Sequence, residues 1–317
     1  MTELTKVTGR RYRAVIISII IAALGYTAFS LWAGWEEVSK AFVEVGITGI
    51  VIVVVLVLIN YLLRFIRWQK YLAIFGHKLP FWDHLRIYLA GFALTTTPGK
   101  AGEALRSFLL EPYGVPFKHS LAAFLSERLA DLIAILLLSF IGLSQYPAAR
   151  PLIIVSVFLI IIALLALSNS KLLNKLLAKL AKRRGKFVNL LSQLCHILLE
   201  AQQCHKLNVI VTATILSILA WGAEAVAFYF ILQWMGAEVS LSFAIFIYAL
   251  SMLAGALSFM PGGLGGAEAV MIALLILKGM TSAEAVAATL LIRFATLWFA
   301  VGLGISVLLI KITKPNG

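Results

Sequence analysis

The stretch of sequence that decides the fold reads Thr95-Thr96-Thr97-Pro98-Gly99-Lys100-Ala101-Gly102-Glu103-Ala104-Leu105-Arg106. It interrupts a strongly apolar part of the chain with a proline and a glycine, and charged residues come directly after them. A similar break comes late in the chain, at Ser258-Phe259-Met260-Pro261-Gly262-Gly263-Leu264-Gly265-Gly266-Ala267-Glu268. An apolar helix with an arginine is expected after each break, with Arg128 in the first and Arg293 in the second. Two broken apolar segments in corresponding positions of two halves predict a binding site near the middle of a membrane.

The composition is typical of a polytopic α-helical membrane protein. Of the 317 residues, 62% are hydrophobic and only 13% are charged, whereas soluble domains are nearer half apolar and a quarter charged. Several apolar stretches reach the roughly 20 residues that a helix needs to cross a bilayer. The net charge of +13 indicates basic cytoplasmic loops and affinity for anionic lipid rather than for nucleic acid.

We predict an all-α fold in a single integral membrane domain over 1–317. It has six full spans, two re-entrant Pro-Gly hairpins and one cytoplasmic amphipathic helix. The spans are placed at about 14–32, 46–66, 120–143, 151–167, 207–235 and 283–310, and the hairpins at 85–110 and 243–277. The first apolar segment lacks a convincing cleavage site, so we expect a span rather than a removable signal. The positive-inside rule predicts a plasma (inner) membrane protein with both termini cytoplasmic.

The basic segment 169–206 connects two units that repeat. Each unit has a span, a hairpin broken at Pro-Gly, and a span with arginine: repeat A covers about 46–143 and repeat B about 207–310. Three full spans separate the two starting points, so the repeats are expected to be inverted, which favours alternating access around a central site. The alternative is that shared Leu, Ile and Val content makes membrane segments look alike, but the matched Pro-Gly, Glu and Arg positions argue against it.

Ionisable residues inside the predicted spans and hairpins are the candidate substrate-binding site, because buried charge in a bilayer is costly and marks transport pathways by default. These residues are Lys100, Glu103, Arg106, Glu127, Arg128, Asp131, Glu268 and Arg293. Glu127 and Asp131 share a helix face and repel each other. Arg106, Lys100 or Arg293 are therefore expected as partners from other elements. The alternative is that all these charges only pair with one another and fix the packing of the hairpins.

The backbone N–H groups at the two breaks are a second candidate feature for binding an anion. Their residues are Pro98, Gly99 and Gly102 in the first, and Pro261, Gly262, Gly263 and Gly265 in the second. A half-helix that begins near Gly99 or Gly265 would point free N–H groups at an anion such as phosphate. Close helix packing through small residues is the alternative, and it explains the second break nearly as well.

No cofactor and no metal site is expected. The two cysteines, Cys195 and Cys204, lie in the basic segment without an acidic or histidine cluster beside them. The histidines lack ligand spacing, and we expect them to be solvated; they are His77, His84, His119, His196 and His205. Tryptophans near the predicted span ends are expected to form an aromatic belt; they are Trp32, Trp35, Trp68, Trp82 and Trp234. Phosphate-loop, dinucleotide and nucleophile-elbow motifs are absent from the sequence.

Four motifs in order resemble the lysylphosphatidylglycerol synthase transmembrane region family, also called the flippase-like domain family. They are Pro98-x-x-x-Gly102-Glu103-x-x-Arg106, Glu127-Arg128-Leu129-x-Asp131, Pro261-Gly262-Gly263-Leu264-Gly265-x-x-Glu268 and the late Arg293. Glu268 stands one position further from the glycine than in the family pattern. The resemblance implies a membrane domain that translocates lipids or acts on lipid head groups. In bifunctional members it precedes a soluble aminoacyl-transferase domain, and neither that domain nor its activity is expected in this chain.

The expected function is therefore that of a lipid translocase rather than an enzyme. Its partners would be membrane lipids, either anionic or aminoacylated phospholipids or polyprenyl-phosphate lipids, with a homo-oligomer as a further option. One alternative is an intramembrane enzyme such as a polyprenyl-pyrophosphate phosphatase, but those enzymes look different in placing a Ser-Arg-Ser cluster where this chain has Pro261-Gly262-Gly263. Another alternative is a non-catalytic membrane subunit whose segment 171–206 binds a partner or anionic lipid.

Overall fold

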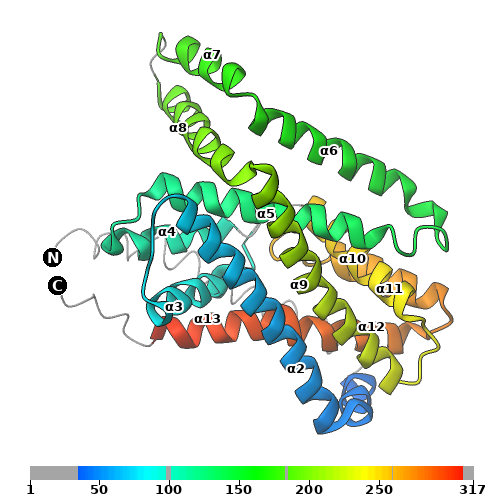
Figure 1. Cartoon of the computed structure of the whole chain (residues 1–317). Coiled ribbons are helices and arrows are strands. Elements are labelled where there is room, and N and C mark those ends of the chain that lie inside the picture. Colours follow the sequence, from blue (N-terminus) through cyan, green and yellow to red (C-terminus); the bar gives the residue numbers. More distant parts are fainter. Residues whose placement is uncertain (1–34, 98–100, 183–184, 259, 310–317) are drawn as a thin grey trace.

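A computed structural model describes residues 35–97, 101–182, 185–258 and 260–309 of the chain. The first predicted span and the break residues Pro98, Gly99 and Lys100 lie outside these ranges. Every regular element within them is a helix, which confirms the predicted all-α class (Figure 1).

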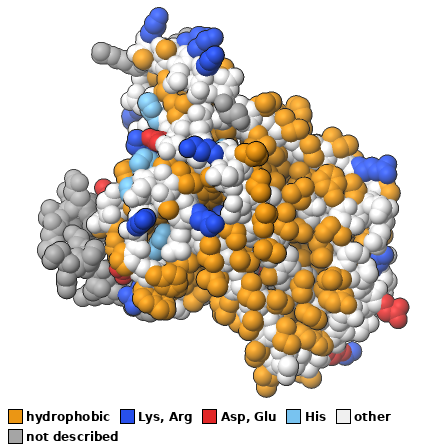
Figure 2. All heavy atoms as spheres, in the orientation of Figure 1, with side chains coloured by type: hydrophobic (Ala, Val, Ile, Leu, Met, Phe, Trp, Pro, Cys, Tyr) orange, Lys and Arg blue, Asp and Glu red, His pale blue; other side chains and the backbone are white. Residues whose placement is uncertain are grey.

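Long apolar helices build the bundle: α2 (Trp35–Ile74), α5 (Phe117–Ser139), α6 (Arg150–Ser168), α9 (Leu207–Trp234), α12 (Ser282–Arg293) and α13 (Phe299–Leu309). Among the described residues, four segments are long and apolar enough to cross a membrane, and they lie at Glu36–Ile74, Pro147–Leu167, Leu207–Trp234 and Ser282–Leu309. Helix α5 has 23 residues but carries three charges in its middle. The count of six spans therefore stays a prediction. Hydrophobic side chains cover a broad face of the bundle (Figure 2).

Helix α2 begins earlier than the sequence predicted. The sequence prediction left residues 33–45 between two spans, yet 36–44 are helical. Gly46 has a φ of +63°, a left-handed conformation that suits glycine, and it kinks the helix there. The part before the kink contributes Val38, Ala41 and Val45 to the core.

Both sequence breaks occur between helices. The first break follows helix α3 (Phe81–Ala90) and the 3₁₀ turn η1 (Gly91–Leu94). After it come the 3₁₀ turn η2 (Ala101–Ala104), helix α4 (Leu105–Leu110) and the 3₁₀ turn η3 (Glu111–Tyr113). The second lies between α10 (Leu241–Leu257) and α11 (Gly266–Leu277), which pack on each other. The helix–break–helix pattern is confirmed at both positions, and re-entrant membrane insertion stays a prediction.

The first hairpin packs closely against α13. A Cβ added to Gly304 would lie 2.2 Å from the backbone nitrogen of Ala93 and 2.7 Å from the carbonyl carbon of Phe92. Only glycine permits this approach. A π-helical segment, η6 (Phe294–Trp298), joins α12 to α13. In this segment the Thr296 carbonyl accepts a hydrogen bond of 2.7 Å from the Tyr61 hydroxyl of α2.

The basic segment differs from the single interfacial helix that the sequence predicted. It forms two helices, α7 (Ser170–Leu180) and α8 (Lys186–Ala201), which project from the bundle as a hairpin and lead through the turn η5 (Gln202–His205) into α9 (Figure 1). Leu173, Leu180 and Cys195 form the centre of its own small core. Part of the leucine stripe of α7 is therefore buried against a second helix, whereas Leu172 stays exposed, as do Phe187 and Leu190 of α8. The interfacial location stays a prediction.

Candidate functional site

Seven ionisable side chains from α2, the first hairpin and α5 meet in the interior of the protein. We call them the first charge cluster; its members are Arg64, Arg67, Arg106 and Arg128 with Glu103, Glu127 and Asp131. All except Arg128 are buried, and the Arg128 side chain is 18% exposed. A charge in a protein interior is tolerated when it is paired and hydrogen-bonded. The four arginines and three carboxylates are paired by charge, but several arginine nitrogens have no hydrogen-bond acceptor among the described residues.

Two of these arginines hold the carboxylates directly. Arg106 Nη2 lies 2.8 Å from Glu127 Oε2 and 3.2 Å from Glu103 Oε2. Arg67 Nη1 lies 2.6 Å from Asp131 Oδ1, and its Nη2 lies 3.2 Å from Glu127 Oε1. Of the three partners that the sequence offered, Arg106 pairs with Glu127, Arg293 pairs with Glu268 instead, and Lys100 lies outside the described residues. The repulsion between Glu127 and Asp131 is relieved mainly by Arg67, which the sequence interpretation did not select.

Neutral side chains complete the support of the carboxylates. Trp221 Nε1 donates to Asp131 Oδ1 at 3.0 Å, and the Tyr88 hydroxyl donates to Glu127 Oε1 at 3.1 Å. The Thr95 hydroxyl, from the first break itself, donates to Glu103. The break is therefore joined to the cluster by a side-chain hydrogen bond as well as by charge.

The second break carries a simpler arrangement. Arg293 Nε lies 2.6 Å from Glu268 Oε1, and Arg293 Nη2 donates to the Gly262 carbonyl at 2.8 Å. Glu268 Oε2 also accepts the backbone N–H of Gly265 at 2.7 Å, which caps the start of α11. The chain therefore fills the N-terminus of this half-helix with its own carboxylate. Gly262 and Gly263 have positive φ angles, and Gly263 packs on Gly255, as expected for close packing through small residues.

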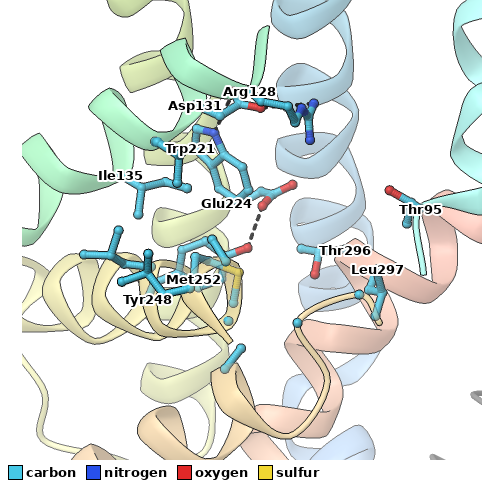
Figure 3. A pocket seen from close by; sticks show the side chains of 18 of the residues that line it. Thr95, Arg128, Asp131, Ile135, Trp221, Glu224, Tyr248, Met252, Thr296 and Leu297 are labelled. Atoms are coloured by element: carbon cyan, nitrogen blue, oxygen red, sulfur yellow. Dashed lines mark hydrogen bonds and ion pairs between the residues drawn. The ribbon is translucent and has the colours of Figure 1, made fainter. Parts of the chain in front are cut away.

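A cavity of about 440 Å³ lies between the two breaks. Figure 3 shows the Arg128, Asp131, Trp221 and Glu224 side chains close to one another in the wall of this cavity, with Thr296 and Leu297 in another part of the wall. Its charged lining residues are Arg64, Arg128, Asp131, Glu224 and Arg293. Glu224 accepts a hydrogen bond of 2.5 Å from the Tyr248 hydroxyl. Apolar side chains from α5, α6 and the second break form much of the remaining wall; they include Ile135, Leu159, Ile160, Leu257 and Met260.

The predicted residues divide into two groups around this cavity. Those that line it are Arg128, Asp131, Gly262, Gly263 and Arg293. Those that support the lining from behind are Glu103, Arg106, Glu127 and Glu268. Gly102 packs inside the first hairpin, where an added Cβ would lie 2.6 Å from the Leu94 carbonyl oxygen. Pro261 and Gly265 belong to the turn before α11. That these residues bind a substrate stays a prediction.

Sequence reasoning missed a buried polar stripe on α2. Its members are Asn60, Arg64, Arg67 and Tyr71. The second span was predicted to end at about residue 66, yet α2 continues to Ile74, and Arg64 and Arg67 are both buried. The spacing of four, three and four residues places all of them on one helix face, so a search for polar residues at helical spacing would have found them.

Two further expectations were wrong. Trp68 is fully buried, with the Arg106 guanidinium 4.1 Å above its ring, and is not part of an aromatic belt. His84 is only 2% exposed, and His77 Nε2 lies 2.9 Å from His119 Nδ1, so these histidines are not simply solvated. Cys195 and Cys204 are both free and buried. No group of three or more potential metal ligands occurs among the residues that the structure describes.

Comparison with known proteins agrees with this architecture. The family described as "Lysylphosphatidylglycerol synthase TM region" matches residues 15–304, which include both breaks and both sets of charges. The chain belongs to this family.

Relatives of this lysylphosphatidylglycerol synthase TM region chain are similar over nearly their whole length. A "UPF0104 membrane protein" of Pyrococcus horikoshii is 22% identical, over 96% of this chain and 98% of that protein. Another, of Methanothermobacter thermautotrophicus, is 24% identical over 92% of this chain and 93% of its own length. A third, of Methanocaldococcus jannaschii, is 24% identical over 95% of this chain and 97% of its own length. With the apolar helices, these matches identify a multi-pass membrane protein.

Proposed function

We propose that the protein is a lipid translocase that holds the polar head group of a membrane lipid in the cavity between the two breaks. The observation that carries the proposal is the composition of the cavity wall. Arginines and carboxylates from α2, α5, α9 and α12 meet there with apolar side chains of α5 and α6. A lipid has the same division, with a charged head and apolar tails.

The dimensions of the cavity support this proposal. Its volume of about 440 Å³ falls within the range of pockets that enclose small ligands. A head group fits such a space, whereas two acyl chains do not, so the tails would remain outside it. Leu159 is 45% exposed and Met260 is 49% exposed although both line the cavity. These residues lie where acyl chains would leave the head-group site for the surrounding bilayer.

The transport cycle that we propose uses the two repeats. The repeats are inverted and the hairpins re-entrant, so that movement of one repeat against the other would expose the cavity to each membrane face in turn. The protein would act in the plasma (inner) membrane with both termini in the cytoplasm. The candidate substrates are anionic or aminoacylated phospholipids and polyprenyl-phosphate lipids, since each carries a phosphate that an arginine can bind.

Reconstitution into liposomes tests the proposal. Head-group exposure of labelled phosphatidylglycerol, aminoacylated phosphatidylglycerol and a short polyprenyl phosphate would be measured with a membrane-impermeant quencher. We expect faster exchange between leaflets than in protein-free liposomes for at least one lipid. The double variant Arg128→Ala with Arg293→Ala should lose this rate, whereas Arg150→Ala on the exposed surface should retain it. Equal rates in wild type and the double variant would contradict the proposed site.

A further inference from the structure

The four arginines of the first charge cluster are not equivalent. Arg67 and Arg106 each approach a carboxylate to within hydrogen-bond distance, at 2.6 Å and 2.8 Å. Arg64 is surrounded by three carboxylates, but its Nη2 atom remains 3.8 Å from Asp131 and 3.9 Å from both Glu103 and Glu127. These separations are beyond the reach of a hydrogen bond.

Two arginines of the first charge cluster line the cavity, Arg64 and Arg128, and both have side-chain donors without a hydrogen-bond partner among the described residues. Within the part of the chain that the structure describes, the Nε and Nη2 atoms of Arg64 and Arg128 are buried and have no hydrogen-bond acceptor. Arg64 itself is only 4% exposed. Arg67 and Arg106 also retain unbonded nitrogens, but neither residue lines the cavity. Buried polar groups in proteins are nearly always hydrogen-bonded, so exceptions that face a cavity point to a missing ligand.

The local charge points to the sign of that ligand. Four guanidinium groups and three carboxylates leave the first charge cluster with one positive charge in excess. An anion bound between Arg64 and Arg128 would balance this local excess; Glu224, the further carboxylate in the cavity wall, lies on α9 and is hydrogen-bonded to Tyr248. The anion would also accept hydrogen bonds from the unbonded Nε and Nη2 atoms of both arginines; Arg128 Nη2 lies 3.2 Å from Asp131 Oδ2 but makes no hydrogen bond to it.

We infer that Arg64 and Arg128 form an anion-binding cradle at the polar end of the cavity, and that its ligand is a phosphate group. The planar guanidinium presents donors in a fork that matches phosphate oxygens. Arg67 and Arg106 are then structural arginines that fix the positions of the carboxylates. Glu103, Glu127 and Asp131 in turn position Arg64 and Arg128 beside the cavity. The assignment of the phosphate to a lipid head group rests on the proposed function; the anion site itself rests on the geometry.

Binding to the purified full-length protein in detergent tests the cradle without any transport. Three probes would be titrated: inorganic phosphate, dihexanoyl phosphatidylglycerol, and dihexanoylglycerol, which lacks the phosphate. Trp221 is a built-in reporter, since its ring centroid lies 5.9 Å from the Arg64 guanidinium carbon. We expect a fluorescence change with both phosphate-bearing probes and none with dihexanoylglycerol. Replacing Trp221 by phenylalanine should remove the change, which assigns the signal to this site.

Matched variants separate the cradle from the structural arginines. Arg64→Gln and Arg128→Gln should each weaken binding of dihexanoyl phosphatidylglycerol by about 10- to 100-fold, as expected for the loss of hydrogen bonds to a charged group. Arg150→Gln removes an exposed arginine and should leave binding unchanged. If Arg64→Gln does not fold, Arg64→Lys keeps the charge without the fork, and competition between inorganic phosphate and the lipid probe on wild-type protein still locates the site.

The outcomes distinguish this inference from the proposed function. Binding of phosphate-bearing probes with no leaflet exchange would support the cradle and contradict the translocase. Binding of inorganic phosphate but not of the lipid probe would support the cradle and overturn its assignment to lipid. Wild-type affinity in both Arg64→Gln and Arg128→Gln would overturn the cradle, even if transport were observed.

Discussion

The first charge cluster and the Glu268–Arg293 pair belong to the same cavity, but the chain completes them differently. Around the second break, one carboxylate meets one arginine, and the remaining polar atoms bond the Gly265 N–H and the Gly262 carbonyl. Around the first break, every carboxylate is shared by several arginines, and donors on Arg64 and Arg128 stay without acceptors. The comparison indicates that the second site mainly fixes the shape of its break, whereas the first keeps unbonded donors beside the cavity, as the proposed anion site requires.

The largest effect is expected when the shared carboxylate Glu127 loses its charge. Glu127→Gln keeps the shape of the side chain but removes the anion that faces both Arg67 and Arg106. Unpaired buried charges cost about 3–5 kcal/mol, so the free energy of unfolding should fall by that amount. Reversible unfolding in mixed detergent–SDS micelles would measure it. Glu111→Gln on the exposed surface is the control, and an equally small change in both variants would refute the shared role.

The next prediction compares the Glu268–Arg293 pair with the first charge cluster, in which several arginines share each carboxylate. Glu268→Leu should destabilise the protein by leaving Arg293 with no carboxylate, and adding Arg293→Met should restore about 2–3 kcal/mol of the loss. The matching pair in the first cluster, Glu127→Leu with Arg106→Met, should not recover, because Arg67 would lose one of its two carboxylates and Glu103 would lose its nearest arginine. The same unfolding measurement compares the two double variants. Similar recovery in both would remove the distinction between the sites.

A smaller effect tests what holds the first break in place. Gly304→Ala would push a methyl group into the backbone of Phe92 and Ala93, and overpacking of this kind costs about 1–3 kcal/mol. Gly302→Ala is the matched control in the same helix, because an added Cβ there meets nothing within 4 Å. We expect only Gly304→Ala to lower the unfolding free energy and to speed hydrogen exchange in α3. Equal behaviour of the two variants would show that α13 does not hold the first hairpin.

The smallest effect concerns the contact between α8 and α5, away from both breaks. A hydrogen bond from Lys118 lowers the pKa of Glu200, and burial lowers the pKa of His119. A carboxylate with a lowered pKa stabilises the fold above its ordinary pKa and loses this contribution as the pH falls. A histidine with a lowered pKa favours the neutral form, so acid also destabilises that contact.

Both groups therefore predict weaker docking of α8 as the pH falls from about 7 to about 4, by under about 1 kcal/mol for such a partly exposed pair. Hydrogen exchange in α8, corrected for the intrinsic pH dependence of the rate, would detect the weaker docking. The variant Glu200→Gln should flatten the profile. A pH dependence that is unchanged in this variant would assign the effect to other groups.

The sequence was sufficient for features that depend on local pattern. Apolar length predicted the helices, and proline and glycine predicted both breaks. Arg106, one of three partners that the sequence offered for Glu127 and Asp131, pairs with Glu127. The unusual spacing of Glu268 is also explained by the structure: at the third position of α11 its carboxylate reaches both Gly265 and Arg293.

The choice between equivalent partners could not be read from the sequence. Basic residues at the end of an apolar run are compatible with either lipid head groups or buried carboxylates, so Arg64 and Arg67 were not selected as site residues. The leucines of α7 could face lipid or another helix, and they face α8. In each case the local physics is the same for both environments, and only the three-dimensional arrangement decides.

The π-helical segment Phe294–Trp298 has a consequence for helical phase. Arg293 and Gly304 are eleven residues apart, about three turns of an uninterrupted α-helix, so they would point in nearly the same direction. A π segment adds a residue to one turn and rotates the later turns of the helix by roughly 100°. Arg293 can thus face the second break while Gly304 faces the first. The extra residue of the π turn therefore lets one continuous apolar helix contact the second break through Arg293 and the first hairpin through Gly304, on different faces.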